Sequence, residues 1–104
     1  MRGPSACCLD PANQTGTILF AEDALLARCG QCGREFIRTS MVWDSDCIDP
    51  MEMELWWPVE DRSDVLSAER DSFHDRQELV AFIMRHKPYF MRNRKAAGDF
   101  RLMD

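Results

Sequence analysis

The chain has 104 residues, the length of one ordinary domain, and its 45% hydrophobic and 30% charged residues are typical of a folded protein. Its apolar runs are far shorter than the roughly 20 residues of a transmembrane helix, and no secretory signal follows the first methionine, so we expect a cytoplasmic protein with reduced thiols. The net charge of −5 argues against general affinity for nucleic acid, because phosphate binding requires a basic surface.

Residues 1–16 contain two prolines and little apolar periodicity, and they predict an irregular arm. The next segment, 17–20, is β-prone and is expected to pair with residues 24–28 across an acidic turn. A short helix over residues 22–28 is the alternative, because alanine and leucine are good helix formers.

The clearest motif is Cys29-Gly30-Gln31-Cys32, a C-x2-C pair. Two cysteines at this spacing can direct both sulfurs to one point if the backbone turns tightly, and Gly30 and Gly33 favour such a turn. Structural zinc is four-coordinate, so the motif predicts a Zn²⁺ site with two further ligands. The candidates are Cys7, Cys8, Cys47, His74 and His86. The preferred set is Cys29, Cys32, Cys47 and one of Cys7 or Cys8, with His74 as the alternative fourth ligand.

The run from Cys29 through Phe36 resembles the first knuckle of zinc-finger and zinc-ribbon proteins. Together with the apolar segments that precede it, the region 7–37 is similar to small phage zinc-finger proteins of the Com type. The vicinal pair Cys7-Cys8 stands where those families carry another C-x2-C. The resemblance implies a viral protein with a zinc-knuckle hairpin.

Two other interpretations of the cysteines remain open. A thiol redox protein would need the C-x2-C motif between a hydrophobic strand and a helix, and the segment after Cys32 does not have a helical pattern. The cysteines could also be buried and inert, with Cys7 and Cys8 unpaired in the arm.

The middle of the chain predicts strands. Residues 35–39 and 41–43 have an extended pattern, and 51–57 alternates cleanly before Pro58 ends it. The alternation directs Met51, Met53, Leu55 and Trp57 to one face. The polar stretch 60–71 is expected to form a loop with at most one helical turn.

The strongest helix pattern covers residues 72–88. Asp75-x-x-Glu78 is a capping-box start, an apolar stripe follows, and Pro88 ends the helix. His86 lies on the apolar stripe and is interpreted as a core or helix-terminal histidine rather than a catalytic one. The remainder, 89–104, is predicted to be a basic tail that begins as an apolar link and ends in a short strand over 100–102.

Charge is unevenly distributed along the chain. From Asp44 to Glu78 there are twelve acidic residues against three arginines, whereas from Arg85 to Arg101 six basic residues accompany one aspartate. The two blocks either attract each other in the fold or present separate faces to partners.

The acidic block supplies the candidate surface for a protein partner. Trp56 follows Glu54 on the face opposite the apolar alternation, and an outward tryptophan ringed by carboxylates is a plausible hot spot. The alternative is that the helix covers this face. The predicted partner-binding residues are Glu52, Glu54, Trp56 and Asp61. The predicted nucleic-acid contacts, in an alternative function, are Arg92, Arg94 and Lys95.

No nucleophilic triad, phosphate loop or dinucleotide fingerprint is present in the sequence, so the chain is not predicted to be an enzyme. We expect an α+β domain spanning 1–104, with a zinc-knuckle hairpin and strands over 17–58 and one main C-terminal helix packed on a small antiparallel sheet. The expected function is a zinc-stapled inhibitor or regulator with an acidic face for a nucleic-acid-handling protein. A nucleic-acid-binding regulator and a thiol redox protein are the alternatives.

Overall fold

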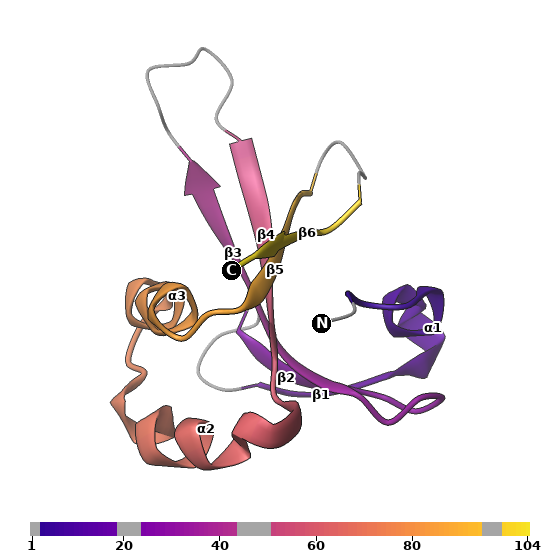
Figure 1. Ribbon diagram of the computed structural model, residues 1–104, viewed down its shortest axis with the longest axis horizontal. Helices are drawn as coiled ribbons and strands as arrows, with labels where there is room; N and C mark the ends of the chain where they lie inside the picture. The colour runs from indigo at the N-terminus through magenta and orange to yellow at the C-terminus, as the bar shows by residue number, and fades with distance from the viewer. Residues whose placement is uncertain (1–2, 19–23, 44–50, 95–98) are drawn as a thin grey trace.

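The fold is built on a six-stranded antiparallel sheet in which the strands lie in sequence order. The computed structural model describes residues 3–18, 24–43, 51–94 and 99–104. Each strand pairs with its neighbours in the chain, so the sheet is a meander (Figure 1). The strands are β1 (Gln14–Ile18), β2 (Leu25–Cys29), β3 (Glu35–Trp43), β4 (Met51–Pro58), β5 (Tyr89–Asn93) and β6 (Arg101–Met103).

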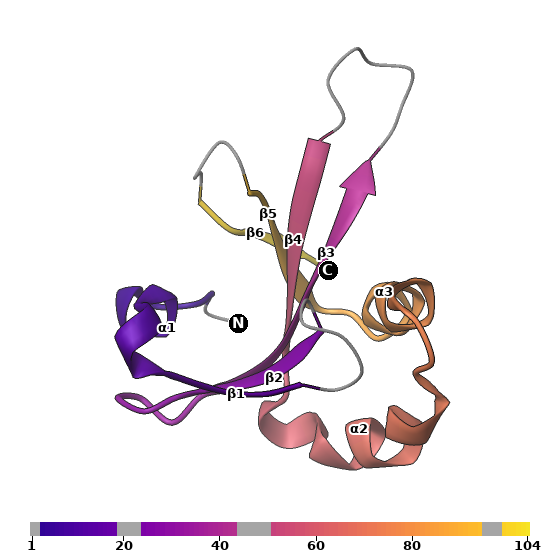
Figure 2. The ribbon, with the colours of Figure 1, turned by 180° about the vertical axis from the view of Figure 1, so that it is seen from behind.

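Helices lie on both sides of this sheet. The two longer ones, α2 (Ser63–Glu69) and α3 (Arg76–Arg85), cover one side, and the short α1 (Ala6–Leu9) lies on the other, as Figures 1 and 2 show. Short 3-10 turns stand next to the helices, at Pro11–Asn13, Glu60–Arg62 and Arg70–Ser72. The predicted α+β class is therefore confirmed, with a larger sheet than expected.

The alternating pattern of β4 divides the core into two clusters. Leu55 and Trp57 point to the helical side, where the Trp57 ring lies 5.0 Å from that of Phe82 in α3. Trp56 points to the arm side and belongs to a buried cluster with Phe36 and Phe90. Since successive side chains of a strand face opposite sides, one eight-residue strand contributes to both clusters.

Trp56 is only 1% exposed, so the prediction of an outward tryptophan is wrong. Helix α3 does not cover it, because α3 packs on the opposite side of the sheet. Its cover is the N-terminal arm, which brings Cys8 into the same cluster, together with Phe100, whose ring lies 5.1 Å away. Burying an indole removes a large apolar area from water, and this offsets the cost of ordering the arm.

Helix α3 begins as the capping box predicts. The Asp75 side chain accepts a hydrogen bond from the Glu78 backbone N–H at 2.9 Å, and the Glu78 carboxylate accepts one from the His74 N–H. The buried stripe consists of Leu79, Phe82 and Ile83. The helix ends at Arg85, three residues before Pro88.

Three expectations for the connecting segments need correction. The polar stretch 60–71 contains the seven-residue helix α2, because Leu66 finds a buried place in the helical-side core that the local pattern did not reveal. Residues 89–93 form β5 rather than a link, since Tyr89 and Phe90 are buried on opposite faces. The arm over residues 3–13 is ordered into α1 and a 3-10 turn rather than irregular.

The acidic and basic blocks attract each other inside the sheet. β4 and β5 are neighbours, and their register places Glu54 opposite Arg92. The Arg92 side chain donates to Glu54 at 3.0 Å, and Arg94 donates to Glu52 at 2.8 Å. Cross-strand pairs of opposite charge stabilise antiparallel strands, so part of the charge asymmetry is used to hold β5 in place.

Candidate metal centre

Four cysteine sulfurs meet at the arm side of the sheet. The Sγ atoms of Cys7, Cys8, Cys29 and Cys32 all lie within 4.8 Å of one another. Two come from α1 and two from the end of β2 and the turn that follows it, so segments more than twenty residues apart contribute equally. A group of this size and composition is a possible metal site.

The turn after β2 positions Cys29 and Cys32. The Gly33 N–H donates to the Cys29 carbonyl at 2.8 Å, and the Cys29 N–H donates to the Arg34 carbonyl at 2.9 Å. Gly33 has a φ of +77°, in the left-handed region that favours glycine. Gly30 is needed for a different reason. A Cβ at this position would lie 3.4 Å from the Asn13 carbonyl oxygen, so glycine lets the arm approach the turn closely.

The arm is held by hydrogen bonds that fix the two vicinal cysteines. The Asn13 side chain donates to the Cys7 carbonyl at 3.1 Å, and the Gln14 side chain donates to the Cys8 carbonyl. The Gly30 N–H in turn donates to the Asn13 carbonyl at 2.7 Å. The arm and the turn therefore meet through their backbones as well as through the thiols.

The sulfur positions suit tetrahedral coordination. Four thiolates at about 2.3 Å from a zinc ion lie roughly 3.8 Å from one another. The Sγ atoms of Cys8 and Cys32 are 3.5 Å apart, and the whole group falls within 4.8 Å. Small side-chain rotations bring such a set to ideal distances, and an all-sulfur set favours soft or borderline metal ions.

The thiols differ in their readiness to ionise. Desolvation, reinforced by the neighbouring thiols of Cys32, Cys29 and Cys8, raises the pKa of Cys7 to about 12. Desolvation also raises the pKa of Cys8. The backbone N–H of Arg34 lowers the pKa of Cys32 to about 7, so this exposed thiol is the first of the three to become a thiolate.

The surroundings of the site combine a buried aromatic side with an exposed entrance. Cys8 and Cys29 are buried with the Trp56 cluster, whereas Cys32 is exposed. The Arg34 guanidinium lies 4.7 Å from the centre of the Phe36 ring, and it donates to the Gly3 carbonyl at 2.8 Å. This arginine therefore fastens the start of the arm beside the thiols.

The predicted ligands are brought together in part. Cys29 and Cys32 are in the cluster, and Cys7 and Cys8 both join it, whereas one of the two was expected. Cys47, the other preferred ligand, lies outside the described residues. His74 is exposed at the start of α3 and is not part of the sulfur cluster. A helical turn at Ala6–Leu9 lets vicinal cysteines face one point, and the sequence pattern gave no sign of this turn.

The predicted partner surface is mostly internal. Trp56 is buried, and Glu54 is 9% exposed and bound to Arg38, Arg92 and the Trp56 indole N–H. Glu52 is half-buried beside Arg94. Of the four predicted residues, Asp61 alone is exposed. The two glutamates of β4 are thus paired with cross-strand arginines, and they do not form an exposed acidic patch.

Two of the predicted nucleic-acid residues, Arg92 and Arg94, lie in β5 and just after it rather than in a free tail. Arg92 and Arg94 are both paired with glutamates of β4, and Lys95 lies outside the described residues. The sequence reasoning missed Arg38, which lies opposite Trp56 and also binds Glu54.

Comparison of the chain with family models, with curated proteins and with solved structures finds no match in any of the three. The resemblance of residues 7–37 to zinc-knuckle proteins therefore stays a prediction. Among the described residues, no helix has the length and apolar content needed to cross a membrane.

Proposed function

We propose that this protein is a non-enzymatic, zinc-stapled interaction protein in which a Zn²⁺ ion joins the N-terminal arm to the sheet. The observation that supports it best is the convergence of four cysteine sulfurs within 4.8 Å. Four thiolates fill a tetrahedral site, which leaves no position for a water molecule or a substrate, as in structural zinc sites. A catalytic zinc site would keep one position open.

The location of the cluster also favours a structural role. Cys8 and Cys29 belong to the same buried cluster as Trp56, Phe36 and Phe90, so a metal ion there would lock the cover of that cluster. A domain of about 100 residues has limited apolar area to bury, and a metal staple adds stability that burial alone does not supply.

The metal content of the purified chain tests this proposal. We expect stoichiometric zinc in the wild type and loss of zinc in the variants C7S, C8S, C29S and C32S. The variant C47S is the matched control, because Cys47 is a ligand in the set predicted from the sequence but not in the cluster of four sulfurs described by the structure. Zinc loss in C47S with retention in C7S or C8S would replace the proposed ligand set, and absence of any stoichiometric metal would refute the staple.

The partner surface that we propose is the acidic surface of α2, the start of α3 and the 3-10 turns beside them. Arg62 points inward, 4.0 Å from the centre of the Trp57 ring, and donates to the Pro88 carbonyl at 2.9 Å. The Arg62 guanidinium is therefore half-buried against the core rather than displayed among the exposed carboxylates, although its charge interacts with that of Glu60. Apart from Glu60, which is paired with Arg34, the exposed carboxylates of residues 60–78 are Asp61, Asp64, Asp71, Asp75 and Glu78. A basic cleft on a nucleic-acid-handling protein is the partner whose charge complements them, and an inhibitor or regulator is the corresponding function.

Paired charge variants test the acidic surface. We expect a partner retained by the immobilised wild-type chain at low salt to be released by high salt and by D61N/D64N. The double variant D99N/D104N removes the same charge from exposed positions at the C-terminus. Retention by D61N/D64N at the wild-type level, or insensitivity of the complex to salt, would rule out this surface.

A further inference from the structure

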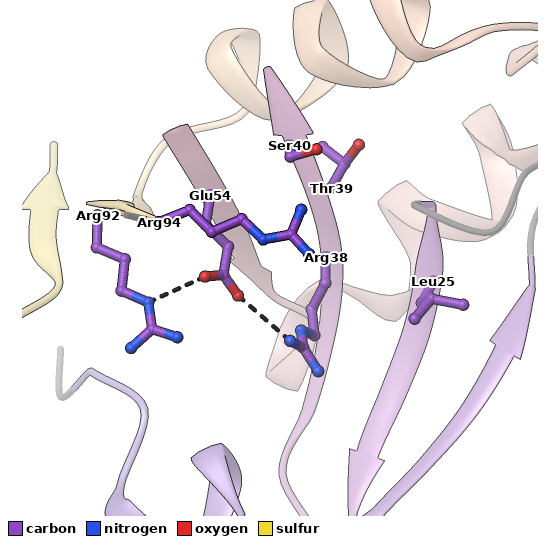
Figure 3. A pocket seen from close by; sticks show the side chains of 7 residues that line it. All are labelled: Leu25, Arg38, Thr39, Ser40, Glu54, Arg92 and Arg94. Atoms are coloured by element: carbon purple, nitrogen blue, oxygen red, sulfur yellow. Dashed lines mark hydrogen bonds and ion pairs between the residues drawn. The ribbon is translucent and has the colours of Figure 1, made fainter. Parts of the chain in front are cut away.

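A cavity of about 490 Å³ opens on the arm side of the sheet, and none of the four clustered cysteines lines it. Its walls come from β2, β3, β4 and β5 and the residue after β5, and its lining is rich in arginine (Figure 3). The register places Ser40 opposite Glu54 and Glu54 opposite Arg92, so these three side chains share one face of the sheet. The lining residues are Leu25, Arg38, Thr39, Ser40, Glu54, Arg92 and Arg94.

Two of the arginines are held in place before any ligand arrives. The Arg38 guanidinium lies 4.2 Å from the centre of the Trp56 ring, and that of Arg92 lies 4.6 Å from the centre of the Phe100 ring. Figure 3 shows the Glu54 carboxylate between them, with an interaction to each. Aromatic stacking and one shared carboxylate reduce the freedom of both side chains, which lowers the entropic cost of binding a ligand.

The charges around the cavity do not cancel. Three guanidinium groups meet two carboxylates, because Glu54 binds Arg38 and Arg92 while Glu52 binds Arg94. The Glu54 carboxylate accepts one hydrogen bond from Arg38, at 3.2 Å, and one from Arg92, at 3.0 Å. The Nε atom of Arg38 is buried and has no hydrogen-bond partner within the described parts of the chain. The cavity therefore keeps a positive excess, and one of its guanidinium groups has a hydrogen-bond donor left unused by the described residues.

We propose that this cavity binds the phosphate group of a small phosphorylated molecule. Guanidinium groups recognise phosphate through paired N–H donors, and arginine is the side chain best suited to that geometry. Ser40 lines the same space with a hydroxyl, and Leu25 offers an apolar wall for the remainder of the molecule. The volume lies within the range of about 300–1,000 Å³ that is typical of small-molecule pockets.

The cavity is a site separate from the cysteine cluster. None of its lining residues is a cysteine, and the arginines that define it are fixed by Trp56, Phe100 and the glutamates of β4. The pyrophosphate titration and the metal analysis therefore report on different residues, so failure of one proposal is distinguishable from failure of the other.

Titration of the full chain with inorganic pyrophosphate at constant ionic strength tests the proposal. We expect saturable amide chemical-shift changes centred on Ser40, Glu54 and Arg92. In the variant R94Q the dissociation constant should rise about tenfold, as expected for loss of one charge-assisted contact. Arg94 is 57% exposed in its side chain, so the substitution leaves the core intact.

The matched control is R101Q. Arg101 is exposed and lies opposite Met91, which packs with the helical-side cluster, so it faces away from the cavity. This variant changes the net charge as R94Q does and should bind pyrophosphate like the wild type. Equal weakening in both variants, or no saturable change in the wild type, would overturn the site. Equally tight binding of succinate would overturn the assignment to phosphate in favour of a carboxylate.

Discussion

The turn that contains Cys29 and Cys32 depends on Gly33, the residue directly after the second cysteine. Its φ of +77° is costly for any residue with a Cβ, although nothing within 4 Å would obstruct the added atom. The requirement at this position is therefore conformational rather than steric.

We expect Gly33→Ala to lower the free energy of unfolding by about 1 kcal/mol. Gly16→Ala is the control, because a Cβ there would lie 3.9 Å from the nearest Leu25 methyl group, an ordinary contact, in an edge strand. Urea denaturation of both variants checks the difference. A loss in G16A as large as that in G33A would show that the backbone conformation of Gly33 is not the cause.

At the scale of the strands, Glu54 joins β3, β4 and β5. Its carboxylate accepts from Arg38, from Arg92 and from the Trp56 indole N–H at 2.7 Å. Burial by itself would raise the pKa of Glu54, but the indole hydrogen bond and the charges of Arg92 and Arg38 outweigh it, and the pKa is lowered. The carboxylate form thus stabilises the folded state.

The sign of this shift predicts how stability depends on pH. A lowered folded pKa contributes stability above the ordinary value of 4.5, and this contribution is lost as the pH falls through the folded value. We expect Glu54→Gln to destabilise the protein by about 2 kcal/mol at neutral pH and by progressively less in acid. Urea denaturation of wild type and variant across this range measures it. A difference that stays constant with pH would contradict the proposed role of the charge.

At the scale of the whole molecule, the sheet separates two clusters with different supports. The helical side is covered by α2 and α3 and contains Phe82, Leu79 and Trp57. The arm side is covered by a short segment whose attachment relies on four cysteines, a few hydrogen bonds and Arg34. Removal of a metal ion should therefore loosen one side of the molecule before the other.

We expect a strong chelator to lower the melting temperature and to increase amide hydrogen exchange in residues 3–13 and 29–34 at least tenfold. Exchange within α3 should change much less, because its buried contacts belong to the other cluster. Exchange measured residue by residue with and without chelator checks this, and re-addition of zinc should restore protection. Uniform loss of protection across both sides would contradict a staple that acts on the arm.

Elements with a local pattern could be predicted from the amino-acid sequence alone. The alternation over 51–57 predicted β4, the capping box at Asp75 predicted the start of α3, and the C-x2-C spacing predicted that Cys29 and Cys32 lie together. In each case the deciding interactions join residues a few positions apart, and such interactions leave a period or a spacing in the sequence.

The segments that cover each face of the sheet could not be predicted in this way, because they come from distant parts of the chain. Trp56 is buried because an arm almost fifty residues earlier folds over it, and both Cys7 and Cys8 reach the knuckle because that arm forms a helical turn. Residues 89–93 form a strand because they pair with β4. The same pairing brings Arg92 and Arg94 to the cavity. These outcomes depend on contacts between distant segments, and the free energy of such contacts comes from burial and charge pairing that no local pattern records.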